Sequence, residues 1–380
     1  MTDAAATPLK AGLEDVVVSN SEICFIDGHK GRLIYRGYDV GDLVAHSTFE
    51  EVVFLLWQGH LPSRKELETH VKALSATANR KLPTKLISML KLLPKKTTPM
   101  EALRTGVSAL SAFDPDADDN SREATLRKAL RLTAQMPTLV AAWERIRRGK
   151  APVTPNPRLT LSGNFLYMMS GKKPTPLATK TVDVALILHA DHEFNASTFA
   201  ARVTAATLSD LHSAVVSGIG ALKGPLHGGA NEQVMLMVEK IKDPASADVW
   251  IRKALADKAR IMGFGHRVYR VEDPRAKHLR RLAMELGQQA GSTANVEILN
   301  TVARVVSAEK NIYPNVDLYS GACYASMGIP TDQFTPIFAI SRVSGWAAHV
   351  LEQHGHNRLI RPRSDYIGAT DLKYVPLSDR

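Results

Sequence analysis

Residues 180–222 read KTVDVALILHADHEFNASTFAARVTAATLSDLHSAVVSGIGAL. This stretch is long, apolar and rich in small side chains, which is typical of buried helices that pack closely against other helices or against a second subunit. Aromatic residues make up 6% of the 380 residues, while alanine, leucine and arginine are plentiful. Because this balance favours helices over strands, the sequence predicts a mostly helical protein rather than a β-sandwich.

Helical signals continue from about residue 40 onward. Thr48 and Ser63 are expected to cap the N-termini of two helices, and Gly59 is expected to end one. Pro137 interrupts the apolar pattern of residues 122–150, which predicts either two helices or one kinked helix. These signals place most of the chain in helices.

Only residues 15–37 have a convincing β-strand pattern. Apolar residues alternate with polar ones on either side of the turn sequence DGHKG, at Ile23, Phe25, Leu33 and Tyr35. The expected fold class is therefore all-α with a small N-terminal β-hairpin.

The formal net charge of +10 is compatible with binding to nucleic acid, to an anionic membrane or to small polyanions. No polybasic run resembles a nucleic-acid-binding tail, because short clusters such as ERIRRGK lie at apparent helix ends, where the helix dipole favours cations. No apolar run approaches the ~18 residues that a membrane span needs. The sequence therefore predicts neither a nucleic-acid partner nor a membrane partner.

The cysteine content and the first residues of the chain predict a cytoplasmic protein. Cys24 and Cys323 are the two cysteines, and they form no CxxC pair, so a reducing compartment is expected. Residues 1–18, MTDAAATPLKAGLEDVVV, lack the basic-then-apolar pattern of a signal peptide.

The sequence KGPLHGGANEQV, residues 223–234, surrounds His227 with glycines. It matches neither the GxxxxGK[ST] nor the GxGxxG pattern, so it does not predict a nucleotide-binding loop. Glycines can leave a histidine ring open to a closely approaching substrate, although one such histidine is also compatible with a structural role. A second loop, MGFGHRVYRVEDPRAKH at residues 262–278, places His266 in similar surroundings and favours a catalytic role for both.

Two charged side chains follow the second loop. Arg275 lies in the sequence DPR, where Pro274 is expected to start a helix, and its planar guanidinium can bind a carboxylate with two hydrogen bonds. A surface ion pair is the alternative. Asp317, in YPNVDLYSG, has apolar neighbours, and burial would raise its pKa and make it a better proton acceptor. A helix cap is the alternative for Asp317.

The segment LHADHEF contains four possible metal ligands, which are His189, Asp191, His192 and Glu193. Two histidines three residues apart share a helix face and, with the acids, could ligate a metal. The segment lacks the HExxH arrangement, and no second cluster completes a site. A role for His192 as a hydrogen-bond donor to a substrate carboxylate is the preferred interpretation.

Arginines near the end of the chain are candidates for anion binding. Arg342 lies in the otherwise apolar helix FAISRVSGWAAH, where a charge is costly unless it is paired, and the sequence RLIRPR adds Arg358, Arg361 and Arg363. Two histidines, one aspartate and several arginines suit proton abstraction next to a carbonyl, followed by carbon–carbon bond formation.

In its motifs the chain resembles the citrate synthases. GPLHGGAN, GFGHRVYRVEDPRAKHL, PNVDLYSG and FAISRVSGWAAHVLEQ…NRLIRPR occur in the order and spacing of that family, and GRLIYRGYDV and ADHEFNAST extend the resemblance to nearly the whole chain. The resemblance implies an acyltransferase of the tricarboxylic acid cycle that condenses acetyl-CoA with oxaloacetate and water to citrate and CoA. The alternative is 2-methylcitrate synthase, which uses propionyl-CoA with the same catalytic set.

The resemblance also implies residue roles. Asp317 matches the base that takes a methyl proton from acetyl-CoA, His227 matches the residue that stabilises the enol, and His266 matches the acid that protonates the oxaloacetate carbonyl. The implied oxaloacetate-binding residues are His192, Arg275, Arg342 and Arg361. The implied CoA-binding residues are Ile261, Met262, Gly263, Phe264 and Gly265. No metal and no cofactor are expected, because the family hydrolyses citryl-CoA without either.

The implied fold has two domains. Residues 1–223 and 323–380 are expected to form a large domain, and residues 224–322 a small domain that closes over oxaloacetate. Arg361 is expected to reach into the partner's site, which implies a homodimer. Two proteins of other classes remain as alternatives, namely a metal hydrolase built on HADHE and a basic helical nucleic-acid binder.

Overall fold

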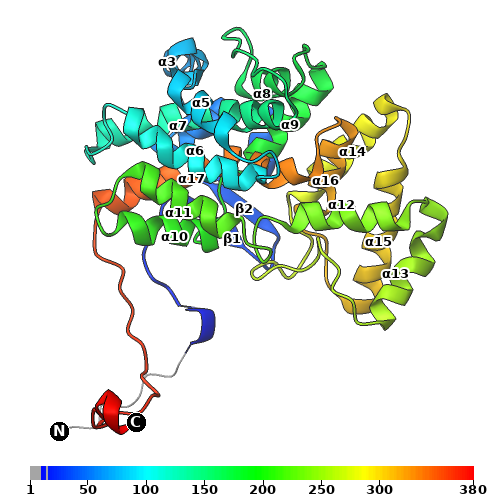
Figure 1. Cartoon of the computed structure of the whole chain (residues 1–380). Coiled ribbons are helices and arrows are strands. Elements are labelled where there is room, and N and C mark those ends of the chain that lie inside the picture. The colour runs from blue at the N-terminus through cyan, green and yellow to red at the C-terminus, as the bar shows by residue number, and fades with distance from the viewer. Residues whose placement is uncertain (1–9, 14–15) are drawn as a thin grey trace.

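The computed structural model describes residues 10–13 and 16–380. Within these residues, seventeen α-helices form the body of the molecule and a small antiparallel sheet lies against it (Figure 1). The expected all-α fold class is confirmed. Residues 1–9 and 14–15 lie outside the described residues, and so does that part of the segment 1–18, which lacks a signal-peptide pattern.

The elements have the following bounds. The first helices are α1 (Val40–His46), α2 (Phe49–Gln58), α3 (Arg64–Ser75), α4 (Thr77–Arg80), α5 (Thr84–Leu92), α6 (Pro99–Leu110), α7 (Arg122–Arg147), α8 (Leu161–Ser170) and α9 (Pro176–His189). The later helices are α10 (Ala196–Ala205), α11 (Leu211–Leu222), α12 (Ala230–Ile241), α13 (Ala247–Ala256), α14 (Ala276–Ala290), α15 (Ala294–Lys310), α16 (Asp317–Ser326) and α17 (Phe334–Gly355). The strands are β1 (Cys24–Asp27), β2 (Arg32–Tyr35) and β3 (Tyr38–Asp39).

The predicted hairpin is present. β1 and β2 pair in antiparallel register, with Cys24 opposite Tyr35 and Asp27 opposite Arg32. The short strand β3, which the sequence analysis did not anticipate, pairs with the other edge of β2. Leu33 and Tyr35 are buried on one face of the hairpin, as the alternation of apolar residues predicts.

Local capping signals predicted several helix ends correctly. The Thr48 hydroxyl accepts a hydrogen bond from the backbone of Glu51 at the start of α2, and Gly59 ends that helix with φ +84°. Ser63 and Glu66 form a capping box at the start of α3. The α7 helix runs without a break through Pro137, so the alternative of two separate helices is wrong.

The core helix is α17. Almost every side chain from Phe334 to Val350 is buried, and the helix contacts α2, α7, α9, α10 and α11. A helix that is apolar on all sides is stable only inside a protein, surrounded by other helices. The long apolar stretch 180–222 forms α9, α10 and α11, which pack around α17 as close packing of small residues predicts.

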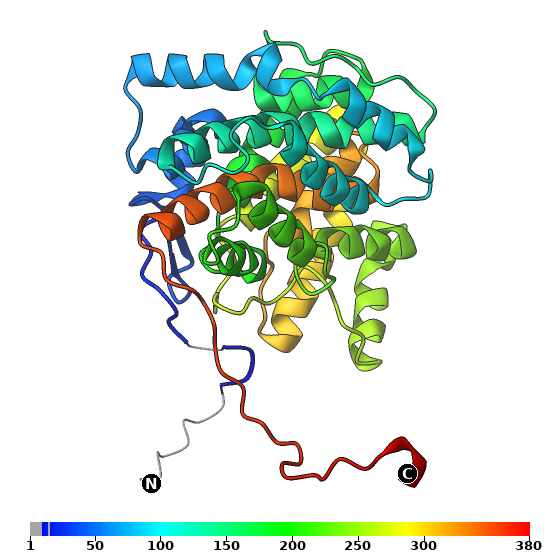
Figure 2. The ribbon, with the colours of Figure 1, turned by 60° about the vertical axis from the view of Figure 1, so that its left-hand side comes forward.

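The helices α12 to α15 lie to one side of the rest, and α17 returns to the larger group (Figure 1). The domain bounds from the sequence remain a prediction, and the position after residue 322 falls inside α16, which packs against α12 and α14. Residues 356–380 leave the body at the end of α17 and extend beyond it (Figure 2). No helix among the described residues is long and apolar enough to cross a membrane.

Close packing of α11 on α17 can be tested at Gly218. A Cβ at this position would lie 2.8 Å from a ring carbon of the buried Trp346. We predict that Gly218→Ala lowers the free energy of unfolding by about 1–3 kcal/mol, as overpacking of a core does. Gly220→Ala in the same helix is the control, because no atom lies within 4 Å of its Cβ and alanine favours helix. Denaturant unfolding of both variants measures the difference, and equal stabilities would contradict this account.

Candidate active site

The two loops that carry His266 and Asp317 are joined by backbone hydrogen bonds. The N–H of Gly265 donates to the carbonyl of Tyr313, and the N–H of Asn315 donates to the carbonyl of Gly263, both at 2.9 Å. Gly263 and Gly265 have φ of +85° and +72°, a conformation that favours glycine. The glycines of the second histidine loop therefore serve to bring His266 and the start of α16 together.

Asp273 fixes Arg275 and links it to the same loop. The Oδ1 atom accepts hydrogen bonds from the backbone N–H and Nε of Arg275, and Oδ2 accepts from Nη2 of Arg275 at 2.7 Å and from the backbone N–H of Val316 at 3.2 Å. Burial opposes the charge of Arg275, but Asp273 holds the pKa of the guanidinium above its usual range. The ion pair that was the alternative for Arg275 is thus present but buried, and Nη1 of Arg275 takes no part in it. The helix α14 begins at Ala276, two residues later than the prediction from Pro274.

The carboxylate of Asp317 is buried at the first residue of α16. Its Oδ1 atom has no hydrogen-bond partner, and the side chain does not cap the helix. Burial raises the pKa of Asp317 to about 7, against a smaller lowering by Arg275. A carboxylate with this pKa and a vacant acceptor atom is suited to act as a general base at neutral pH.

His266 is held in one tautomer. Its Nδ1 atom accepts hydrogen bonds from the backbone N–H groups of Val268 at 3.0 Å and Tyr269 at 3.2 Å. Because Nδ1 is an acceptor, the proton of the neutral ring lies on Nε2, which can donate to a substrate. Burial, together with the charge of Arg275, lowers the pKa of His266 to about 4.

His192 lies beside His266. The two ring centroids are 4.9 Å apart, and the hydroxyl of Tyr269 lies 3.3 Å from Nε2 of His192. Burial and the neighbouring cation of Arg275 lower the pKa of His192 well below its usual value. Both rings are therefore neutral at neutral pH and can hydrogen-bond to a carbonyl or a carboxylate.

His227 is oriented by Ser197 at the start of α10. The backbone N–H of Ser197 lies 3.3 Å from Nε2 of His227, and the Ser197 hydroxyl lies 2.8 Å from it. Because a backbone N–H can only donate, Nε2 is an acceptor and Nδ1 carries the proton. Trp346 holds Ser197 in turn by donating from Nε1 to the hydroxyl. Burial, with a smaller effect of Arg342, lowers the pKa of His227 to about 3.

Arg342 is a buried cation, and its guanidinium donates no hydrogen bond to a carboxylate of the described residues. Its Nε donates to the carbonyl of His189 at 2.7 Å, its guanidinium lies over the ring of Phe338, and Nη1 is buried without a partner. Burial lowers the pKa of Arg342 to about 10, so the group remains charged at neutral pH. A buried guanidinium nitrogen without a partner fits a site that binds an anion.

The predicted site residues fall into two groups. The structure brings six of them into one connected region, which are His192, His266, Arg275, Asp317, Gly263 and Gly265. Arg342 and His227 extend this region, since the ring of Phe338 contacts both. Arg361 lies apart, exposed in the segment that follows α17.

The possible metal ligands near His192 do not converge. His189 faces the carbonyl of Ala185, while Asp191 contacts His349 at 3.1 Å. Among the described residues there is no group of three or more histidine, cysteine or acidic side chains that could hold a metal ion. The HADHE segment therefore contributes separate contacts rather than a ligand set.

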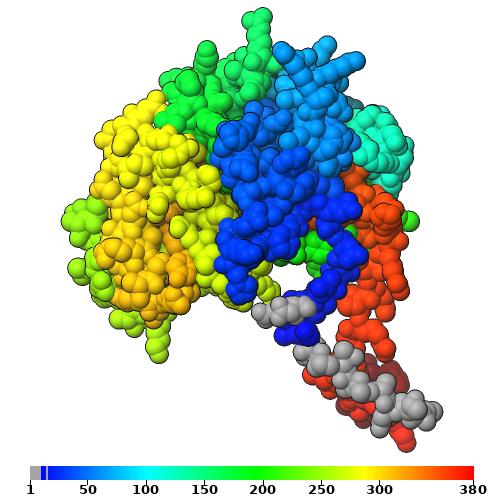
Figure 3. Space-filling view, turned by 180° about the vertical axis from the view of Figure 1, so that it is seen from behind, coloured from blue at the N-terminus to red at the C-terminus, as the bar shows by residue number. Residues whose placement is uncertain are grey.

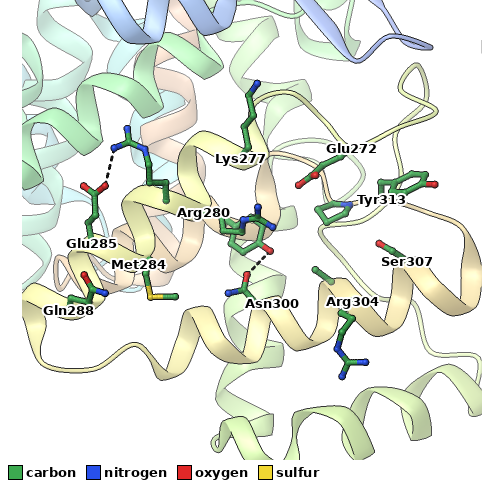
Figure 4. A pocket seen from close by; sticks show the side chains of 14 residues that line it. Glu272, Lys277, Arg280, Met284, Glu285, Gln288, Asn300, Arg304, Ser307 and Tyr313 are labelled. Carbon is green, nitrogen blue, oxygen red and sulfur yellow. Dashed lines mark hydrogen bonds and ion pairs between the residues drawn. The ribbon is translucent and has the colours of Figure 1, made fainter.

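Two cavities adjoin Tyr313 and Pro314 in the loop before α16. A cavity of about 280 Å³ is lined by His266, Tyr269 and Asp273, together with Gly265 and Pro314 of the paired loops. An open cavity of about 700 Å³ lies between α14 and α15 and is lined mainly by charged and polar side chains (Figure 4). The larger one contains none of the predicted catalytic residues, and the smaller one contains His266 but neither His227 nor Asp317.

Comparison with known proteins agrees with this geometry. The family model "Citrate synthase, C-terminal domain" matches residues 12–363. The chain belongs to the citrate synthase family. A citrate synthase from Haloferax volcanii is 48% identical over 377 residues, which cover 98% of this chain and 99% of that protein. The crystal structure of citrate synthase from Pyrobaculum aerophilum superposes with a TM-score of 0.92 at 42% identity and covers 99% of this chain and 97% of that chain.

The similar proteins include an enzyme whose name gives a different product. A 2-methylcitrate synthase from Mycobacterium tuberculosis is 44% identical over 360 residues, which cover 95% of this chain and 91% of that protein. A citrate synthase from the archaeon Thermoplasma acidophilum, whose structure contains carboxymethyl coenzyme A and oxaloacetate, has a TM-score of 0.91 at 35% identity and covers 98% of this chain.

Sequence reasoning missed the residues that orient the predicted ones. Asp273, Ser197 and Tyr269 hold Arg275, His227 and His192 respectively. The acid in EDPR two residues before Arg275 was a usable signal, because this spacing allows a bidentate pair. Ser197 carried no comparable signal, since its contact with His227 spans 30 positions of the chain.

The raised pKa of Asp317 predicts a pH-dependent effect on stability. The folded protein holds the proton up to about pH 7, whereas the unfolded chain releases it near its usual pKa of about 4. Stability therefore falls as the pH rises through this window, because the folded state binds more protons. We expect Asp317→Asn to become more stable than the unsubstituted protein across the window, by up to about 4 kcal/mol above pH 7.

Denaturant unfolding at several pH values measures this difference. Asp118→Asn, at an exposed aspartate in the loop before α7, is the control for a change of charge alone. A constant difference between Asp317→Asn and the unsubstituted protein from pH 4 to pH 8 would show that Asp317 is not protonated in the native state near neutrality.

Proposed function

We propose that this protein condenses acetyl-CoA with oxaloacetate and water to give citrate and CoA. The observation that carries the proposal is the buried, unpartnered carboxylate of Asp317 in one site with neutral histidines. This arrangement is suited to removing a weakly acidic proton next to a carbonyl, because the base is poised near neutral pH and the donors carry no charge of their own. The reaction is that of the tricarboxylic acid cycle.

Enolisation is assigned to Asp317 and His227. Oδ1 of Asp317 takes a proton from the methyl group of acetyl-CoA, and the Nδ1–H of His227 donates a hydrogen bond to the thioester oxygen as negative charge develops there. A neutral donor suits this task, because the acidity of its N–H proton is matched to the acidity of the enol proton. In a buried site this proton is also not lost to bulk solvent.

Carbon–carbon bond formation is assigned to His266. The enol carbon attacks the ketone carbon of oxaloacetate, and the ketone oxygen takes a proton from Nε2 of His266 to become the hydroxyl of citryl-CoA. Water then cleaves the thioester, which releases citrate and CoA. The site resets when Asp317 gives up the methyl proton and His266 regains a proton on Nε2, so that the two changes balance.

Oxaloacetate binding is assigned to three hydrogen-bond donors of one subunit, two arginines and a histidine, and to one arginine of a second copy of the chain. Arg275 offers Nη1, Arg342 offers its unpartnered Nη1, and His192 offers a ring N–H. Arg361 is proposed to enter the partner's site in a homodimer, which is supported by its exposed position on the segment that extends beyond α17 (Figure 2). The site needs no metal ion for these steps.

CoA binding is assigned to the loop Ile261 to Gly265. The loop is supported in this role by its position beside Asp317 and by two glycines whose backbone can approach a ligand closely. A cytoplasmic location is part of the proposal, and it is supported by the two buried free cysteines, Cys24 and Cys323.

The substrate assignment can be tested with purified protein, oxaloacetate and either acetyl-CoA or propionyl-CoA, by following loss of the thioester. We expect faster turnover of acetyl-CoA, unaffected by EDTA. A preference for propionyl-CoA would move the assignment to 2-methylcitrate synthase, because one methylene is worth about 1–3 kcal/mol in a pocket. No turnover of either thioester would contradict the proposed function.

The role of Arg361 can be tested by Arg361→Ala. We expect the KM for oxaloacetate to rise at least tenfold, which is the loss of about 1.4 kcal/mol expected for a charge-assisted hydrogen bond to a carboxylate. Arg363→Ala, two residues along the same exposed segment, is the matched control. An unchanged KM in a variant that light scattering shows to be dimeric would contradict the intersubunit role.

A further inference from the structure

The N-terminal hairpin touches both segments that carry the histidines assigned to oxaloacetate. From behind, the hairpin (blue) lies directly against the segment that follows residue 260 (yellow-green and yellow), although the two are more than 200 positions apart in the chain (Figure 3). The mechanism above gives the hairpin no task, and its strands are too short to form a stable sheet on their own. Its two contacts with the site therefore need a separate explanation.

The turn of the hairpin holds the loop of His266. The carbonyl of Gly28 accepts a hydrogen bond from the N–H of Arg270 at 2.9 Å. A Cβ on Gly28 would lie 2.2 Å from the carbonyl oxygen of Val268, so only glycine fits at this approach. Val268 and Tyr269 are the residues whose N–H groups fix Nδ1 of His266. The turn thus rests on the backbone that sets the orientation of this ring.

The second strand of the hairpin holds the segment of His192. The hydroxyl of the fully buried Tyr35 lies 2.9 Å from the carbonyl of Asp191 and 3.2 Å from that of Ile187. The same hydroxyl accepts a hydrogen bond from the N–H of Asp191 at 3.4 Å. Asp191 directly precedes His192, so this one side chain fixes the turn of backbone from which His192 projects.

We infer that the hairpin is a template that sets the distance between His192 and His266, with Tyr35 and Gly28 as positioning residues. His192 lies in the segment after α9, and His266 lies in the loop before α14. The paired strands β1 and β2 and their turn contact both segments. A binding site for a small dianion has to hold its donors to within about half an ångström. This inference rests on the proposed function, because it concerns the donors assigned to oxaloacetate.

The test uses two variants of the full chain. Tyr35→Phe removes the hydroxyl but keeps the ring, and we expect the KM for oxaloacetate to rise at least fivefold while kcat changes less. Gly28→Ala pushes the turn away from Val268, and we expect both a higher KM and a kcat at least tenfold lower, because the ring of His266 moves. The matched controls are Tyr38→Phe on the exposed strand β3 and Lys30→Ala at the exposed tip of the same turn.

A second measurement does not depend on turnover. Hydrogen exchange followed by mass spectrometry should show faster exchange of the amides at residues 268–270 in Gly28→Ala than in Lys30→Ala. Tyr35→Phe should leave these amides protected and should raise exchange near residue 191 instead. This difference between the variants is expected of two separate contacts and not of a general loss of stability.

The outcomes separate the two proposals. If the unsubstituted protein does not turn over oxaloacetate and acetyl-CoA, the proposed function fails. If it does, and Tyr35→Phe and Gly28→Ala retain its KM and kcat and the exchange rates of the controls, the template is wrong. A lower melting temperature with unchanged KM in both variants would likewise overturn the template, because it would show that the hairpin only stabilises the fold.

Discussion

The rest of the site depends on the buried carboxylate of Asp273. Its two oxygens accept four hydrogen bonds, three from Arg275 and one from the backbone of Val316. Burial of an ion pair is costly unless the geometry is good and further hydrogen bonds satisfy its polar atoms, and here both oxygens of Asp273 are paired. One side chain therefore holds the guanidinium in place and ties the loop before α14 to the loop before α16, so that Asp317 and His266 share one site.

Burial and two arginines set the protonation states of the site. Arg275 and Arg342 are buried cations, and burial together with these charges keeps His192, His227 and His266 neutral. The same burial raises the pKa of Asp317 and outweighs the lowering by Arg275 and Arg342. An anion is the ligand that such a site lacks, because the guanidinium of Arg342 donates to no described carboxylate and its Nη1 is buried without a partner. Neutral hydrogen-bond donors and a carboxylate with a raised pKa suit a reaction that forms an enol.

Much of this could be predicted from sequence because the signals are local. The caps at Thr48 and Ser63 and the alternation in β2 depend on a few neighbouring residues, and the motifs around His227, His266 and Asp317 identify the site by resemblance. The orientations of His192 and His227 could not be predicted, because they depend on partners far along the chain, Tyr269 for His192 and Ser197 for His227. The role of the hairpin was hidden for the same reason, since Tyr35 contacts Asp191 across 156 positions.

The central claim is that Asp317 removes the methyl proton of acetyl-CoA. The most direct test is exchange of the methyl hydrogens of acetyl-CoA with deuterium from the solvent, in the presence of malate, which resembles oxaloacetate but lacks the ketone and cannot condense. The account predicts exchange in the unsubstituted protein and in His266→Asn, and a rate at least 100-fold lower in Asp317→Asn, as expected for loss of a general base. Exchange at the full rate in Asp317→Asn would contradict it.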